Sequence, residues 1–219
     1  MRGNLTLVNS DYIGAQVRAL HGIEPTTLPP PVPGTFPEVS WESRADRFVC
    51  IGRLSPEKRI EVIVDILARV RAAGANVRLE VIGTADKPRY SRFVRRLVLE
   101  HAAWMSLHEN VSRAELVELV ARGRYGIHAM PDEHFGIAVA EMVRGGCIPF
   151  VATGGGPMEI VGGDPRLLFG STDEAARQIL TTLGDPARQA DLRAHLAGRA
   201  DLFSTARFVA RLQELVRQV

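Results

Sequence analysis

Short apolar runs alternate with segments of helical periodicity along most of the chain. An apolar run of four to eight residues between turn-forming residues is typical of a buried strand, whereas apolar residues that recur every three or four positions indicate a helix. Strands are therefore expected at residues 47–51, 77–82, 104–108, 125–130, 148–152 and 167–169. Helices are expected at residues 56–73, 88–102, 113–122 and 136–144, with three more from residue 172 onward.

This alternation predicts the fold class. Strands separated by helices form parallel sheets, and these strands are too apolar to leave one face of the sheet open to water. We therefore expect an α/β fold with a doubly wound parallel sheet.

A separate strand and helix precede this pattern. Residues 5–8 (LTLV) are expected to form a strand, and Ser10 with its neighbours can cap a helix that runs to about Leu20. Residues 26–38 (TTLPPPVPGTFPE) contain too many prolines for a helix interior or a central strand, and indicate an extended linker. The chain thus divides into a strand–helix unit (1–25), a hinge (26–40) and one α/β domain (41–219).

Composition excludes several classes of function. The 219 residues are 46% apolar, 24% charged and 6% aromatic, and a net charge of +2 is too small to indicate nucleic-acid binding. No signal-peptide pattern and no apolar run long enough to span a bilayer is present. We expect a cytoplasmic protein that can associate with the membrane periphery.

The cysteines and histidines show neither a disulfide pattern nor a metal-binding pattern. Cys50 and Cys147, the only cysteines, lie in apolar runs and are expected to be inert buried thiols, which favours a reducing compartment. The six histidines lack metal-ligand spacing, and no Asp-x-Asp pair is available to hold a divalent cation against a diphosphate. We expect neither a metal nor a cofactor.

The stretch YGIHAMPDEHFGIAVAEMVRGGCIPFV (125–151) carries the clearest chemistry. It predicts a strand, a short acidic loop, a helix that opens at Gly136, a double-glycine stop and a second strand. Glu133 and Glu141, separated by seven residues, can border a cleft at the carboxyl end of the strand, where open α/β sheets bind ligands. Free amides at the helix start, near Phe135 to Ala138 and including Gly136 and Ile137, attract an anion. Alternatively, Glu133 only complements the helix dipole and Glu141 pairs with Arg144.

A second group of candidates follows other strands. In IGRLSPEKR (51–59), Arg53 and Lys58 can both reach an anion above the sheet, although a solvated cation pair beside Glu57 and Glu61 is the alternative. Gly83 ends one strand, and Ser112 with Glu115 forms a capping box. The loop ATGGGPMEIV (152–161) contributes Gly155 and Glu159, either as lining of the cleft or as a purely structural loop.

EHFGIAVAE resembles the motif of two glutamates in retaining family 4 glycosyltransferases of the GT-B fold, and its spelling is closest to the branch with the dolichol-pathway α-1,2-mannosyltransferase. The resemblance implies that Glu133 contacts the donor sugar and Glu141 the nucleotide ribose. It also implies that Gly52–Arg53 with Lys58 binds the donor diphosphate. His134 stands where the family usually has glycine, so the motif does not give the donor sugar.

Other segments carry the same resemblance. It implies that the backbone near Val111 contacts the nucleobase and that Gly155 lies beside the donor sugar. NSDYIGAQVRALHGI, at the head of the chain, is similar to the last strand and helix of the N-terminal Rossmann domain of these enzymes. The remainder of that domain, which binds the acceptor glycan, lipid or small molecule, is not represented.

The resemblance therefore implies a donor-binding domain for a nucleotide-diphosphate sugar, GDP-mannose or a UDP-sugar, in a retaining hexosyltransferase that needs no metal. Arg53, Lys58 and Glu133 are the expected catalytic residues. The alternatives are a non-catalytic nucleotide-sugar-binding module, or a subunit completed by a partner chain. A sugar-nucleotide epimerase of the same fold is a third interpretation.

Overall fold

The computed structural model describes residues 4–217, so the outermost residues of the predicted first and last units (1–3 and 218–219) lie outside the described part. Its main body is a six-stranded sheet with the order β5-β4-β3-β6-β7-β8, in which all pairings are parallel. The strands are β3 (Ala45–Ile51), β4 (Arg78–Gly83), β5 (Met105–Glu109), β6 (Gly123–His128), β7 (Ile148–Ala152) and β8 (Leu168–Phe169). The prediction of a doubly wound parallel sheet is confirmed.

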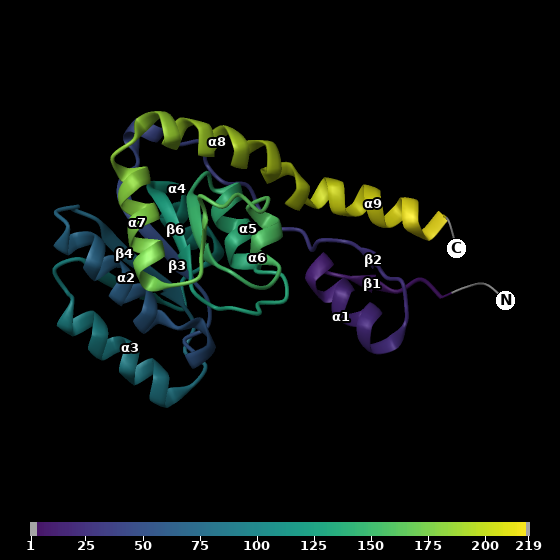
Figure 1. Cartoon of the computed structure of the whole chain (residues 1–219), viewed down its shortest axis with the longest axis horizontal. Helices are drawn as coiled ribbons and strands as arrows, with labels where there is room; N and C mark the ends of the chain where they lie inside the picture. The colour runs from purple at the N-terminus through teal and green to yellow at the C-terminus, as the bar shows by residue number, and fades with distance from the viewer. Residues whose placement is uncertain (1–3, 218–219) are drawn as a thin grey trace.

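Helices cover both faces of this sheet because its strands alternate their side chains between two apolar clusters (Figure 1). From β3, Phe48 and Cys50 join the larger cluster, which includes residues of α2 (Ile60–Ala72), α3 (Pro88–Glu100) and α7 (Thr172–Leu183). Val49 and Ile51 join the smaller cluster, which includes residues of α4 (Arg113–Arg122) and α5 (Ile137–Arg144). This alternation is the two-residue period of a strand buried on both faces.

The N-terminal unit is more complete than the sequence predicts. Strand β1 (Leu7–Val8) is followed by α1 (Asp11–His21) and by β2 (Thr26–Thr27), which pairs in parallel with β1. The strand β2 lies at the start of the predicted linker, where the residues before the first proline are still free to pair.

The rest of the hinge is packed on the domain instead of running free. The Val32 amide donates to the Phe203 carbonyl at 2.8 Å, and the Val32 side chain belongs to the larger apolar cluster. Arg113 and Arg144 donate to the carbonyls of Pro33 and Val32, respectively. Residues 28–40 contain no helix or strand, and they are anchored on the domain at several points.

The C-terminal helices return toward the N-terminal unit. Helix α8 (Pro186–Ala200) crosses the domain, and η3 (Asp201–Phe203) connects it to α9 (Thr205–Arg217), which projects beyond the sheet alongside α1, β1 and β2 (Figure 1). A cavity of ≈ 540 Å³ lies between them, lined by Leu28, Phe135, Phe203 and Phe208 among others.

One helix prediction needs correction, and three short elements were not predicted. The helix expected at residues 56–73 is interrupted, because η2 (Pro56–Lys58) ends at Arg59, whose φ of 50° lies in the left-handed region, and α2 begins only at Ile60. Lys58 therefore lies on a separate turn and not in the first turn of α2. The short helix α6 (Pro157–Ile160) and the turns η1 (Trp41–Ser43) and η3 were not predicted, since segments of three or four residues are too short to show a helical period. Over the described residues, no helix combines the length and apolar character needed to cross a membrane.

Candidate functional site

The strand order reverses between β3 and β6, in the middle of the sheet. From β3 the chain adds β4 and then β5 on one side, and β6 then pairs with the opposite side of β3. The loops that follow β3 and β6 therefore run to opposite sides. At the carboxyl ends of two such neighbouring strands, the loops separate and leave room for a ligand. The loop after β3 carries Lys58, and the loop after β6 carries Glu133.

Lys58 and Glu133 meet across this point. The Lys58 ammonium donates to the Glu133 carboxylate, and it also lies 3.5 Å from the sulfur of Met130. Both side chains are mostly buried. The structure thus brings together two of the three expected catalytic residues, which are 75 positions apart in the sequence.

A third group, His128, lies behind this pair and was not predicted from the sequence. Its side chain is 3% exposed, its Nε2 is 3.7 Å from the Glu133 carboxylate, and Nε2 has no hydrogen-bond partner. Burial and the Lys58 charge lower the pKa of His128 to about 4, although Glu133 opposes the shift, so the imidazole is neutral at pH 7. A histidine at the end of an apolar run carries no local signal that separates it from a core residue.

Glu133 itself is held as a carboxylate. Burial alone would raise the pKa of Glu133, but the hydrogen bond from Lys58 and the charge of Lys58 outweigh burial and lower the pKa. A charged, hydrogen-bond-accepting group is therefore present at neutral pH beside a cation.

Glu141 has a different environment and a different partner from the alternative considered for it. Arg113, the first residue of α4, donates to the Glu141 carboxylate, whereas Arg144 donates to the Val32 carbonyl and stacks near Phe36. The alternative of a Glu141–Arg144 pair is therefore wrong, and Arg113 is the partner that the sequence did not reveal. Burial raises the pKa of Glu141, and Arg113 opposes this rise only in part.

Arg53 lies on the same loop as Lys58 but turns outward. Its guanidinium is 3.1 Å from Asp86 and 3.6 Å from Glu57, and its side chain is 64% exposed. The predicted contact with Glu57 is present, whereas Glu61 instead accepts a hydrogen bond from Tyr90. Exposed ion pairs of this kind contribute about 0–1 kcal/mol, so an anion of higher charge can displace them.

The candidate glycines let neighbouring loops approach one another. A Cβ on Gly83 would lie 2.4 Å from the Gly52 carbonyl oxygen, and one on Gly155 would lie 2.4 Å from the Glu133 carbonyl oxygen. A Cβ on Gly52 would meet the Lys58 side chain at 3.3 Å. These glycines bring the loops after β3, β4, β6 and β7 into backbone contact, which fixes the positions of Lys58 and Glu133.

The start of α5 has the geometry expected for an anion site. Gly136 caps the helix with a φ of 94°, and Ile137 is half exposed, at 42%. The Phe135 side chain packs on Phe203 at a ring separation of 5.9 Å and lines the cavity beside α9. The first amides of a helix lack acceptors within the helix.

Val111 and Glu159, two further predicted residues, have different surroundings in the structure. Val111 follows β5 at the same edge of the sheet and packs against the smaller apolar cluster, directly before Ser112, which caps α4 through the Glu115 amide at 3.2 Å. The Glu159 carboxylate accepts hydrogen bonds from the amides of Asp11 and Tyr12, so it is engaged by the start of α1.

The chain resembles known proteins in both sequence and fold. Residues 35–200 match the family model described as glycosyl transferases group 1. The Dictyostelium discoideum protein named GDP-Man:Man(3)GlcNAc(2)-PP-Dol alpha-1,2-mannosyltransferase is 24% identical over 229 residues, and the match covers 93% of this chain and 45% of that protein. The Candida glabrata protein of the same name is 25% identical over 177 residues, which is 71% of this chain and 34% of the relative. The chain therefore spans less than half the length of either relative.

Solved structures show the same fold. Anabaena HepE, in complex with UDP and glucose, superposes with a TM-score of 0.79 at 20% identity and covers 98% of this chain and 63% of that one. The pneumococcal O-GlcNAc transferase GtfA, in complex with UDP and GlcNAc, gives a TM-score of 0.77 at 16% identity, with 97% and 44% covered. The six-stranded sheet is the Rossmann-like half of a GT-B fold. Since the family model matches most of the domain, the chain belongs to the glycosyl transferases group 1 family.

Proposed function

We propose that this chain is the donor-binding half of a retaining glycosyltransferase. It binds a nucleoside-diphosphate sugar, and the hexose passes to an acceptor held by an N-terminal domain of the whole enzyme. The observation that carries this proposal is the Lys58–Glu133 pair at the point where the strand order reverses. A cation for a phosphate and a carboxylate for sugar hydroxyls stand there side by side.

The proposed roles follow from the positions of the residues. Lys58, Arg53 and the amides from Phe135 to Ile137 hold the diphosphate and stabilise the negative charge that develops on it as the sugar leaves. Glu133 accepts hydrogen bonds from the sugar, and Glu141, aligned by Arg113, accepts them from the ribose. The backbone near Val111 meets the base, while Gly52, Gly83 and Gly155 allow the loops to close around the donor.

In the proposed reaction, the bond between the sugar C1 and the phosphate oxygen breaks, and the acceptor oxygen bonds to C1 on the same face. The acceptor proton passes to the departing phosphate. No carboxylate of the chain acts as a nucleophile, and two cations at one strand end supply the charge that a metal would otherwise provide. The donor is proposed to be GDP-mannose, as the names of the relatives suggest, with a UDP-sugar as the second candidate.

Titration calorimetry tests this proposal. GDP, UDP, GDP-mannose and UDP-glucose are titrated into the chain with and without EDTA. Binding of one base in both its diphosphate and sugar forms, unchanged by EDTA, is expected. If none of the four ligands binds, the proposed function is wrong, and if EDTA abolishes binding, the metal-free site is wrong.

A transfer assay separates catalysis from the alternative of a non-catalytic binding module. The 219-residue chain is expected to bind donor without transferring it, because orientation of the acceptor requires the opposite wall of the site. Addition of an N-terminal acceptor domain should restore transfer. Robust transfer by the chain alone would contradict the first expectation, and donor binding with no transfer in the completed protein would favour the binding module.

A further inference from the structure

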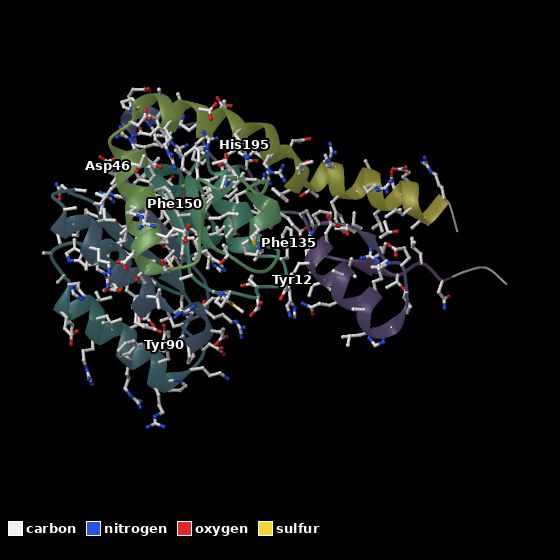
Figure 2. The ribbon with its side chains drawn as sticks, viewed as in Figure 1. Tyr12, Asp46, Tyr90, Phe135, Phe150 and His195 are labelled. Carbon is white, nitrogen blue, oxygen red and sulfur yellow. The ribbon has the colours of Figure 1, made fainter. Side chains whose placement is uncertain are left out.

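The N-terminal unit holds the residues on both sides of Glu133. The Tyr12 hydroxyl donates to Asp132 at 2.9 Å, and the Ser10 hydroxyl donates to the backbone carbonyl of His134. Figure 2 shows Tyr12 at the junction between α1 and the main domain. The cap of α1, Ser10, and a residue of its first turn, Tyr12, thus form hydrogen bonds with the residues directly after and before Glu133, the proposed sugar-binding residue.

The position of α1 is itself fixed by the domain. The Glu159 carboxylate accepts hydrogen bonds from the Tyr12 and Asp11 amides at 2.7 and 2.9 Å, which supplies acceptors for free amides at the start of α1. Ser10 is buried, and its hydroxyl also accepts from the Ile13 amide at 3.2 Å. The side chains of Ser10 and Tyr12 are therefore held in fixed orientations toward the loop of residues 132–134.

The opposite side of the loop is held by a glycine-rich segment. The Gly156 amide donates to the Glu133 carbonyl at 2.8 Å, and Glu133 and Gly155 form an isolated parallel bridge. Asp132 adopts a φ of 55°, a left-handed conformation that is unfavourable for most residues and persists only where neighbours hold it. The Tyr12 hydrogen bond ends on this residue.

We propose that Ser10 and Tyr12 are positioning residues of the donor site. They hold the loop from Asp132 to His134 so that the Glu133 carboxylate lies where the donor sugar meets it. The inference rests on the proposed function and extends the sugar part of the site into the N-terminal unit. Because Glu133 is proposed to touch only the sugar, the two residues affect a nucleotide sugar and leave a bare nucleoside diphosphate almost unaffected.

Binding by single-hydroxyl variants tests this role. Tyr12→Phe and Ser10→Ala are compared with the unaltered chain by calorimetry, with GDP and GDP-mannose or with UDP and UDP-glucose. Each variant should bind the nucleotide sugar about 2- to 10-fold more weakly, as expected for one lost hydrogen bond, and the diphosphate within about twofold of the parent. Tyr125→Phe is the matched control, since it removes a buried hydroxyl with no partner from the middle of β6.

Two substitutions of Asp132, the residue that accepts the Tyr12 hydrogen bond, give a second test. Asp132→Asn keeps an oxygen acceptor and tolerates the left-handed conformation, so it should bind both ligands as the parent does. Asp132→Ala should behave like Tyr12→Phe. Equal weakening of both ligands together with a lower melting temperature would show a purely structural role, and unchanged sugar-nucleotide binding would show no role; either result overturns the proposal.

Hydrogen exchange provides a readout that needs no ligand. Amides of residues 132–134 should exchange faster in Tyr12→Phe and Ser10→Ala than in the parent, whereas Tyr125→Phe should not change them. Unchanged exchange would overturn the positioning role even if donor binds. If the unaltered chain binds no donor, the proposed function fails, and the exchange data still decide whether Ser10 and Tyr12 hold the loop.

Discussion

The Lys58 ammonium and the Glu133 carboxylate form an ion pair that joins the loops after β3 and β6. A diphosphate that binds Lys58 must compete with Glu133 for the same cation. The two residues are therefore expected to respond in opposite ways to mutation.

Removal of Glu133 should separate sugar binding from phosphate binding. Glu133→Ala should leave the affinity for bare diphosphate unchanged or slightly higher, because Lys58 is released and a negative charge near the phosphates is lost. It should weaken the nucleotide sugar by about 0.5–3 kcal/mol. Calorimetry with both ligands measures this, and equal losses for the two would show that Glu133 does not contact the sugar.

Removal of Glu141 should act on both ligands alike. If its carboxylate binds the ribose, Glu141→Ala weakens the diphosphate and the nucleotide sugar equally, by about 0.5–3 kcal/mol. Glu118→Ala, at an exposed pair with Arg122 on α4, is the control for loss of a glutamate–arginine contact. A melting temperature that falls while both affinities stay constant would assign Glu141 a structural role only.

Removal of either cation should weaken diphosphate binding. Arg53→Ala and Lys58→Ala should each weaken diphosphate binding by about 1.5–3 kcal/mol, the range for hydrogen bonds to charged groups. Isothermal titration at two salt concentrations checks this, since charge-assisted contacts weaken as salt rises. A normal affinity in Arg53→Ala would indicate that Arg53 stays with Asp86 when the donor binds.

How much of this was visible in the sequence depends on the distance between partners. The strands and most helices are local patterns, and they were predicted within a few residues. The break at Arg59 was missed because a left-handed residue leaves no trace in the apolar period. The Arg113–Glu141 pair spans 28 positions, and the Glu159 contacts with α1 span about 148, so only the folded chain reveals them.

Acid should destabilise the folded chain through His128. The folded pKa is about 4, below the ordinary 6.5, so between these values only the unfolded chain binds the proton. The free energy of unfolding should therefore fall as pH drops from about 6.5 to 4, by up to about 3 kcal/mol, with no effect of this group above 6.5. Urea unfolding of the parent and His128→Gln across this range measures it.

In that comparison, carboxylates such as Glu109, whose pKa Arg95 lowers, titrate in both proteins and cancel in the difference. A variant with the same acid dependence as the parent would contradict a buried neutral imidazole.

The glycine that faces Glu133 should not tolerate a methyl group. Gly155→Ala places a Cβ against the Glu133 backbone in a residue with a φ of 85°. Gly74→Ala has a similar φ of 96° but no atom within 4 Å, so it carries only the conformational cost. Gly155→Ala should lower the free energy of unfolding by about 1–3 kcal/mol more than Gly74→Ala in urea titrations. Equal losses would mean that the loop moves aside freely.

The contact between Glu159 and the start of α1 also bears on how the chain folds. Acceptors for the first amides of α1 lie about 148 positions further along, so this contact has a high sequence separation and its loop closes late. During synthesis, α1 leaves the ribosome long before Glu159 is made, while the strands from β3 to β7 can already pair in order. Docking of the N-terminal unit is thus expected to be among the last steps of folding.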